Sequence, residues 1–176
     1  MRINYHAKHS IYVGGDRVKF SCGHMTIFPD GTKEKLHGHN FNVGVAIFLR
    51  DIEPESFLDL KIVRKHINAQ CDAWDERVLL PGKSPYFEVV KENGAEVELL
   101  LCRKRYVFPS DEVILLPVTN VIVETLAVEF GQSLIASLGP ILRRDVVDGV
   151  DVTVSEAPGQ GGLYHWDWNS SNSVKG

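Results

Sequence analysis

The chain has 176 residues, of which 44% are hydrophobic and 24% charged, and its formal net charge is −4. This balance is typical of one globular domain with a sizeable core, and it disfavours a disordered chain, a general nucleic-acid binder and a polybasic membrane binder. No apolar run approaches the roughly 20 residues of a membrane span, and the N-terminus lacks the apolar core of a signal peptide. Because the three cysteines, Cys22, Cys71 and Cys102, have no CxxC spacing, we expect no disulfide framework and a cytoplasmic location.

The first half of the chain alternates apolar and polar residues in the way that strands do. Residues 18–24 and 37–49 each place the side chains of one parity on one face of a sheet. Between them, Pro-Asp-Gly at 29–31 is a turn signal. The sequence therefore predicts a hairpin with a long connection, residues 25–36.

Two helices are predicted from apolar residues at helical spacing. The first begins near Asp59, a residue type that suits the N-cap, and the second runs over 121–138 and stops at Gly139-Pro140. A strand over 150–156 follows, and Glu156 continues the parity of its apolar residues. The apolar stripe of the first helix consists of Leu60, Val63, Ile67, Cys71 and Trp74.

Residues 86–115, between the helices, are typical of a β-rich insertion. Asn-Gly at 93–94 is a strong hairpin signal between two apolar runs, and further short strands are expected at 106–108 and 113–116. The order of strands, helix, insertion, helix and strand predicts an α+β fold with an antiparallel sheet, in one domain over 1–176. Residues 169–176 are expected to form a flexible tail.

Three histidines are candidates for a metal site. His37 and His39 lie at i and i+2 on one predicted strand face, and His24 ends the neighbouring strand. Three neutral imidazoles with an open fourth position are the arrangement of a catalytic zinc site. Taken alone, an HxH pair is more often a coincidence on a surface or in a core, so the pairing of the two strands decides between the readings.

The residues around these histidines resemble the 6-pyruvoyl-tetrahydropterin synthase family. FSCGH at 20–24 and HGHNF at 37–41 match its F-S-x-x-H and H-G-H-N-[YF] motifs. Weaker matches follow in the family's order at 57–60, 74–81, 120–127 and 154–158. The resemblance covers about residues 3–158, within which 86–115 is a poorly matched insertion.

The resemblance implies the tunnelling fold: an antiparallel four-stranded sheet with two helices on one face. Three subunits close a barrel and two barrels stack as a homohexamer, with active sites between subunits. It further implies zinc held by His24, His37 and His39. Glu156 would anchor the pterin, because a carboxylate accepts two parallel N–H donors as it accepts an arginine fork. Glu124 would be a second pterin contact or merely an acid in the first turn of a helix.

One departure from the family's usual pattern concerns the catalytic cysteine. No cysteine lies between His24 and His37, where most members have one, and Glu34 stands three residues before His37. This resembles the subgroup associated with cleaving the side chain of dihydroneopterin triphosphate to 6-hydroxymethyl-7,8-dihydropterin. Glu34 is therefore a candidate general base, with a solvated loop charge as the alternative. Cys22 shares a face with His24, but a small buried cysteine is the commoner outcome.

A second departure lies at Asp75-Glu76, where most members have Asp-His. In the family that histidine works with the missing cysteine as a proton-transfer pair, so the two losses together suggest altered acid–base chemistry. Asp75 and Glu76 are catalytic candidates on this ground. The alternative is a structural ion pair with Arg77.

These observations lead to the hypothesis of a zinc-dependent lyase acting on 7,8-dihydroneopterin triphosphate, by triphosphate elimination or by side-chain cleavage. One alternative is the 6-carboxytetrahydropterin synthase of deazaguanine (queuosine) biosynthesis, which normally keeps the cysteine and the Asp-His pair. Another is a pterin-binding homologue without catalysis. The expected partners are a small pterin and other copies of the chain, with neither nucleic acid nor membrane.

Overall fold

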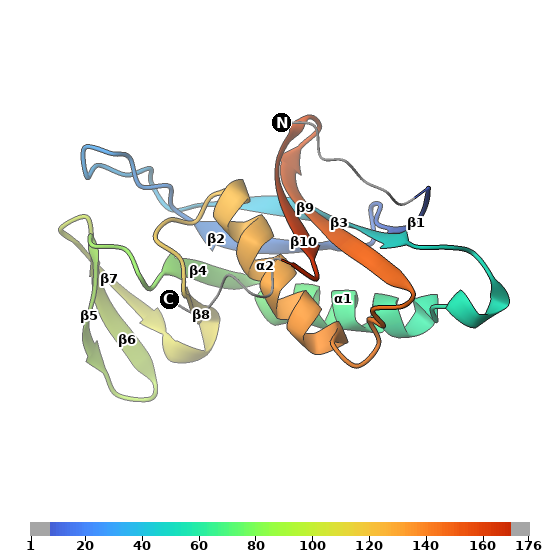
Figure 1. The fold of residues 1–176 in the computed structure, drawn as a ribbon. Coiled ribbons are helices and arrows are strands. Elements are labelled where there is room, and N and C mark those ends of the chain that lie inside the picture. Colours follow the sequence, from blue (N-terminus) through green and yellow to red (C-terminus); the bar gives the residue numbers. More distant parts are fainter. Residues whose placement is uncertain (1–7, 170–176) are drawn as a thin grey trace.

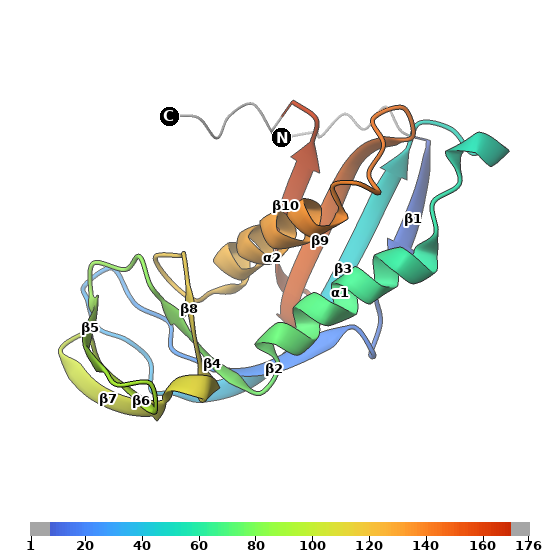
Figure 2. The ribbon, with the colours of Figure 1, turned by 90° about the horizontal axis from the view of Figure 1, so that it is seen from below.

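A computed structural model describes residues 8–169 and shows two helices on one face of a large sheet, beside a smaller sheet (Figures 1 and 2). The α+β class predicted from the sequence is confirmed. Apart from Asn169, the expected tail lies outside the described residues. Neither the helices nor the short 3-10 turns in this range are long and apolar enough to cross a membrane.

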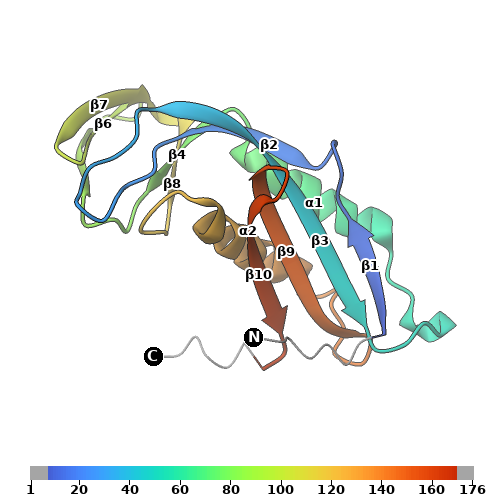
Figure 3. The same cartoon turned by 90° about the horizontal axis from the view of Figure 1, so that it is seen from above.

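The large sheet has seven strands in the order β10-β9-β3-β2-β4-β8, with β1 paired to β3 beyond the end of β2. Figure 3 views it from the face opposite the helices. Its strands are β1 (His9–Val13), β2 (Lys19–His24), β3 (His37–Leu49), β4 (Arg77–Pro81), β8 (Val113–Leu116), β9 (Val147–Ala157) and β10 (Gln160–Asp167).

This sheet is larger than the antiparallel four-stranded sheet that the resemblance implied, and it is mixed. The strands from β10 to β2 are antiparallel, whereas β4 runs parallel to β2, and β8 parallel to β4. The reversal follows the first helix, where Glu76 has a left-handed φ of 55° and its N–H donates to the carbonyl of Ser21 at 2.7 Å. After α1 the chain therefore runs beside β2 in the same direction, as β4, and β8 later adds a further parallel strand next to β4.

The first helix begins where the sequence places a cap residue, and the second begins slightly later than predicted. α1 (Leu60–Trp74) is capped by Asp59, whose carboxylate accepts the N–H of Lys61 at 2.8 Å, as predicted. α2 (Val123–Leu138) begins two residues later than predicted and ends at the predicted residue. Two 3-10 turns, η1 (Pro54–Ser56) and η2 (Ser110–Glu112), lie in the connections.

The main core lies between the helices and the sheet. Phe20 is its centre, with ring centroids 5.3 Å from those of both Phe41 and Trp74. α2 also packs very closely on β10: a Cβ at Gly162 would run into the backbone oxygen of Val123. Only glycine permits that approach. Gly161 and Gly162 pair with β9, so the glycine-rich start of β10 belongs to the sheet.

The insertion forms its own three-stranded antiparallel sheet of β5 (Phe87–Glu92), β6 (Glu96–Leu101) and β7 (Lys104–Pro109). The predicted hairpin around Asn93-Gly94 is confirmed. The strand predicted at 113–116 joins the large sheet instead, as β8. Met25 and Ile27, from the 25–36 connection, are buried against this small sheet in a second core cluster, together with Leu80, Leu99 and Leu101.

Candidate functional site

The three histidines converge at the ends of β2 and β3. His24 pairs directly with His37, and Cys22 with His39, so the three imidazoles project from the same face of the sheet. Their ring centroids lie 4.6, 4.9 and 5.3 Å apart, and one ligand atom from each lies within 4.8 Å of the others. The predicted strand pairing is confirmed, and this histidine cluster could hold a metal ion.

Backbone carbonyls orient two of these rings. The Nδ1 of His24 lies 3.1 Å from the carbonyl oxygen of Val121, and the Nδ1 of His37 lies 2.9 Å from that of Lys35. Each carbonyl accepts an Nδ1–H, which leaves the Nε2 lone pair free to ligate.

The Nε2 of His24 is a buried nitrogen with no hydrogen-bond partner within the described part of the chain. Burial also lowers the pKa of His24, so its imidazole is neutral near pH 7. A neutral, buried and unpartnered imidazole nitrogen costs free energy unless a ligand binds it, and three nitrogen donors suit zinc. The residues therefore fit the metal.

Glu34 lies beside the cluster. Its Oε2 is 3.9 Å from the Nε2 of His37, and its backbone N–H donates to the carbonyl of Thr26 at 2.9 Å. A hydrogen bond from the Thr26 side chain holds the pKa of the Glu34 carboxyl below its usual range, and the nearby His37 and His24 act in the same direction. The structure thus brings an ionised carboxylate to the edge of the metal-binding cluster.

Glu156 and Glu124 lie near the cluster without touching it. Ser155 pairs with Asn42, so Glu156 comes alongside Phe41 on the face that carries the histidines, and its side chain is half-buried. Glu124 is exposed in the first turn of α2, three residues after Val121. Neither carboxylate hydrogen-bonds to a histidine within residues 8–169, which leaves both available to a ligand.

Asp75 and Glu76 are both tied to β2 at Ser21. The carboxylate of Asp75 accepts the backbone N–H of Ser21 at 2.6 Å, and the Glu76 N–H donates to the carbonyl of the same residue. Ser21 faces the opposite side of β2 from His24, since neighbouring side chains alternate. Its hydroxyl donates to Asn40 at 2.5 Å on that side.

Two sets of contacts in the site were not predicted, although Asn120 begins one of the segments that match the family. One is the pair of carbonyls that orient the histidines. The other is Asn120, whose amide donates to the carbonyl of Ile27 and accepts the N–H of the same residue, both at 2.9 Å. Asn120 thereby fastens the connection that carries Glu34 to the start of α2.

Cys22 is excluded as the nucleophile by its surroundings. Burial, with a smaller contribution from the Asp75 charge, raises the pKa of its thiol to about 12. It is the inert core cysteine expected from the sequence.

Comparisons with known proteins agree with this geometry. The chain is 29% identical over 150 residues to a Methanocaldococcus jannaschii protein named as a 6-carboxy-5,6,7,8-tetrahydropterin synthase, covering 84% of this chain and 89% of that relative. The solved structure of Plasmodium vivax 6-pyruvoyl tetrahydropterin synthase superposes with a TM-score of 0.82 at 25% identity, over 90% of this chain and 98% of that one. Two further structures of the P. vivax enzyme carry alanine or cysteine in place of a glutamate described as a catalytic residue.

The family model of 6-pyruvoyl tetrahydropterin synthase matches residues 15–165, a stretch that includes β2, β3, both helices and the insertion. On this match, the chain belongs to the 6-pyruvoyl tetrahydropterin synthase family.

Proposed function

We propose that the protein is a zinc-dependent lyase that cleaves the side chain of 7,8-dihydroneopterin triphosphate and leaves 6-hydroxymethyl-7,8-dihydropterin. The observation that carries this proposal is the carboxylate of Glu34, rather than a cysteine, 3.9 Å from a nitrogen of the histidine cluster. A catalytic glutamate in the P. vivax relative supports the same role for Glu34. Zinc would be held by His24, His37 and His39 and, when bound, would polarise an oxygen of the substrate side chain.

Glu34 would act as the general base. A carboxylate that accepts a proton from the 2′-hydroxyl allows the C1′–C2′ bond to break, with an aldehyde forming at C2′. The electron pair passes to the pterin ring, whose C6–N5 imine accepts it, and a proton returned to C1′ completes the hydroxymethyl product. Glu34 is ionised before the reaction, as a base must be, and its exposure at the edge of the cluster gives it access to substrate.

Glu156 and Glu124 would hold the pterin ring. Both are carboxylates without a hydrogen bond to the cluster, and both lie on its side of the sheet. A pterin whose amino and ring N–H groups donate to Glu156 would direct its C6 side chain toward the histidines.

A homohexamer of two trimers, with sites shared between subunits, belongs to the same proposal. β1 and β10 each pair with a single neighbour, so both present free edges that other subunits can cover. Neither Asp75 nor Glu76 has a hydrogen bond or ion pair with the three histidines within residues 8–169, so a catalytic role for them is proposed only at a site shared with a second subunit. The expected mass in light scattering at micromolar concentration is that of six chains, and a monomer would contradict the assembly.

A second candidate, 6-carboxytetrahydropterin synthase, is favoured by the name of the M. jannaschii relative. The two reactions start from the same substrate and differ in what remains on C6. Glu34 favours side-chain cleavage, because a cysteine is the usual residue in carboxytetrahydropterin synthases.

The test is product analysis after incubation of the zinc-loaded protein with 7,8-dihydroneopterin triphosphate. We expect 6-hydroxymethyl-7,8-dihydropterin, identified by mass and chromatography. A pyruvoyl product would assign triphosphate elimination, and a carboxy product would assign the second candidate. If no product forms while a pterin analogue still binds, the protein is a pterin-binding homologue without catalysis.

A further inference from the structure

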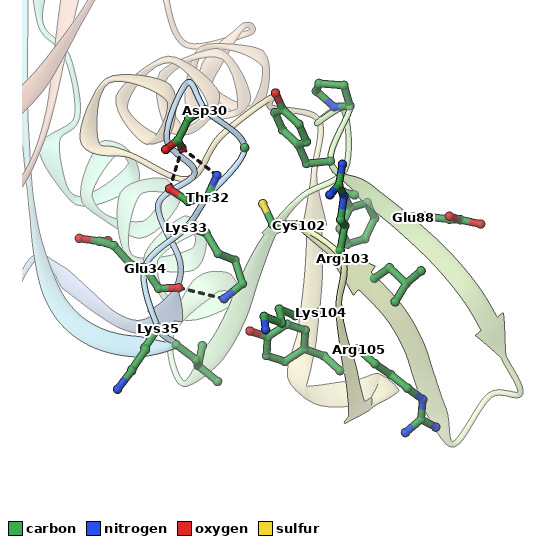
Figure 4. A pocket seen from close by; sticks show the side chains of 17 residues that line it. Asp30, Thr32, Lys33, Glu34, Lys35, Glu88, Cys102, Arg103, Lys104 and Arg105 are labelled. Carbon is green, nitrogen blue, oxygen red and sulfur yellow. Dashed lines mark hydrogen bonds between the residues drawn. The ribbon is translucent and has the colours of Figure 1, made fainter.

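Beside the histidine cluster, the 25–36 connection and the insertion enclose a hollow of about 1260 Å³ (Figure 4). One wall is the connection from Asp30 to Leu36, and the other is the start of β5 with the turn between β6 and β7. We call this region the basic hollow, after its five basic lining residues: Lys33, Lys35, Arg103, Lys104 and Arg105.

The acidic residues of the lining do not neutralise these cations. Asp30 accepts hydrogen bonds from the N–H and the hydroxyl of Thr32, at 2.9 and 2.6 Å, and so is committed to its own turn. The carboxylates of Glu34 and Glu88 point away from the hollow in Figure 4. The side chains of Lys35 and Arg105 also point away in Figure 4, so the positive charge of the hollow comes from Lys33, Arg103 and Lys104.

Two of the cations are already engaged. Arg105 forms an ion pair with Glu98 at 2.7 Å, and Lys33 donates to the carbonyl of Glu34 at 2.9 Å. The remaining three have no ion pair or side-chain hydrogen bond with any residue between 8 and 169. These are Lys35 on one wall and Arg103 and Lys104 on the other.

The walls are held together. Cys102 and Arg103 form a two-residue turn with φ values of 50° and 63°, a conformation that glycine and asparagine usually supply. The N–H of Cys102 donates to the carbonyl of Tyr86 at 2.9 Å, and a Cβ at Gly31 would come within 3.0 Å of the Tyr86 ring. Tyr86 thus sets the position of the turn against the tip of the connection.

We propose that the basic hollow binds the triphosphate chain of the substrate, an inference that rests on the proposed function. Lys35 joins the two places: its carbonyl orients His37, and its residue also lines the hollow. A pterin side chain lying at the histidines would therefore carry its phosphates past Lys35 toward Arg103 and Lys104. Arg and Lys are the side chains that pair with phosphate oxygens, and the two uncommitted cations of the turn, Arg103 and Lys104, suit a polyanion.

The test compares two adjacent Arg-Lys pairs. R103Q/K104Q removes two charges from the hollow, and R64Q/K65Q removes the same two charges from the exposed side of α1. Calorimetry at fixed ionic strength would measure binding of neopterin triphosphate, inorganic triphosphate and unphosphorylated neopterin. We expect R103Q/K104Q to bind neopterin triphosphate about 10-fold more weakly or worse, with neopterin unchanged and R64Q/K65Q like the wild type.

Equal affinity of both double variants for neopterin triphosphate would overturn the proposal. So would a loss confined to inorganic triphosphate, because the hollow would then take free polyphosphate rather than substrate. These measurements need no turnover, so a catalytically silent protein would refute the proposed reaction while leaving this result standing. Should circular dichroism show that R103Q/K104Q does not fold, K104Q alone tests the same wall, and unchanged affinity there would equally reject the proposal.

Discussion

The molecule has two hollows of opposite charge, one beside the 25–36 connection and the other beside the C-terminal end of α1. The basic hollow faces the connection that carries Glu34, whereas an acidic hollow of about 530 Å³ surrounds Glu76 at the junction of α1, β4 and η2. The acidic one is lined by five carboxylates and one arginine: Asp72, Asp75, Glu76, Asp111, Glu112 and Arg77. A polyanionic substrate is attracted to the first and repelled by the second. On the proposed function, the difference favours approach of the substrate from the side of Glu34, where the proposed general base lies.

The largest effect is expected from loss of the metal, because the proposal places the reaction at the histidines. His37→Ala should lose most of its zinc, since His37 supplies one of three convergent nitrogens. Metal analysis after dialysis checks this against His66→Ala, whose histidine lies on α1 near Ser137. Full zinc occupancy in His37→Ala would remove this residue from the ligand set.

The two hollows are compared directly by removing one carboxylate from each. Glu34→Ala should lower turnover by about 10²–10⁴-fold, the usual contribution of a positioned base, while zinc and pterin binding persist. Glu76→Ala should lower turnover less if its hollow lies outside the reaction. Rates with zinc-loaded protein decide the matter, and the reverse order would move the proton chemistry to Glu76.

Binding of neopterin and of inorganic triphosphate can be measured separately, which distinguishes contacts to the pterin ring from contacts to the phosphates. Glu156→Gln keeps the shape but replaces one acceptor oxygen with a donor, so neopterin should bind about 10- to 150-fold more weakly. Titration calorimetry measures this. Inorganic triphosphate, which has no ring, should bind Glu156→Gln as it binds the wild type, and unchanged neopterin binding would place the ring elsewhere.

The smallest expected effect concerns the wall of the basic hollow. Gly31→Ala and Gly94→Ala both place alanine at a left-handed φ, 79° and 83°, which costs about 1–2 kcal/mol. At Gly31 the new Cβ also meets Tyr86, whereas at Gly94 nothing lies within 4 Å. Urea unfolding should therefore show a larger loss of stability for Gly31→Ala. Equal losses would mean that the Tyr86 ring moves aside without a cost in free energy.

The sequence predicted the parts of the site that depend on local periodicity. Alternation along 18–24 and 37–49 was enough to bring His24 to His37 and His39, because strand parity is fixed by the backbone. It could not predict the parallel pairing of β4 with β2, because β4 is a strand of five residues without alternation. The strand β10 was not predicted, because glycines are typical of linkers and the close packing of α2 that requires them cannot be read from the sequence.

The contact of Gly162 with the backbone of Val123 has a consequence for how this chain tolerates change. Val123 opens α2, and two residues earlier the carbonyl of Val121 holds the ring of His24. Any side chain at 162 would lift the start of α2 from β10 and disturb that carbonyl. A library of random variants sorted for lost metal should therefore be enriched at position 162, far along the chain from every histidine of the cluster. The geometry of the histidine cluster thus depends on a glycine that belongs to another strand and contacts none of the three histidines in the pairing of β2 with β3.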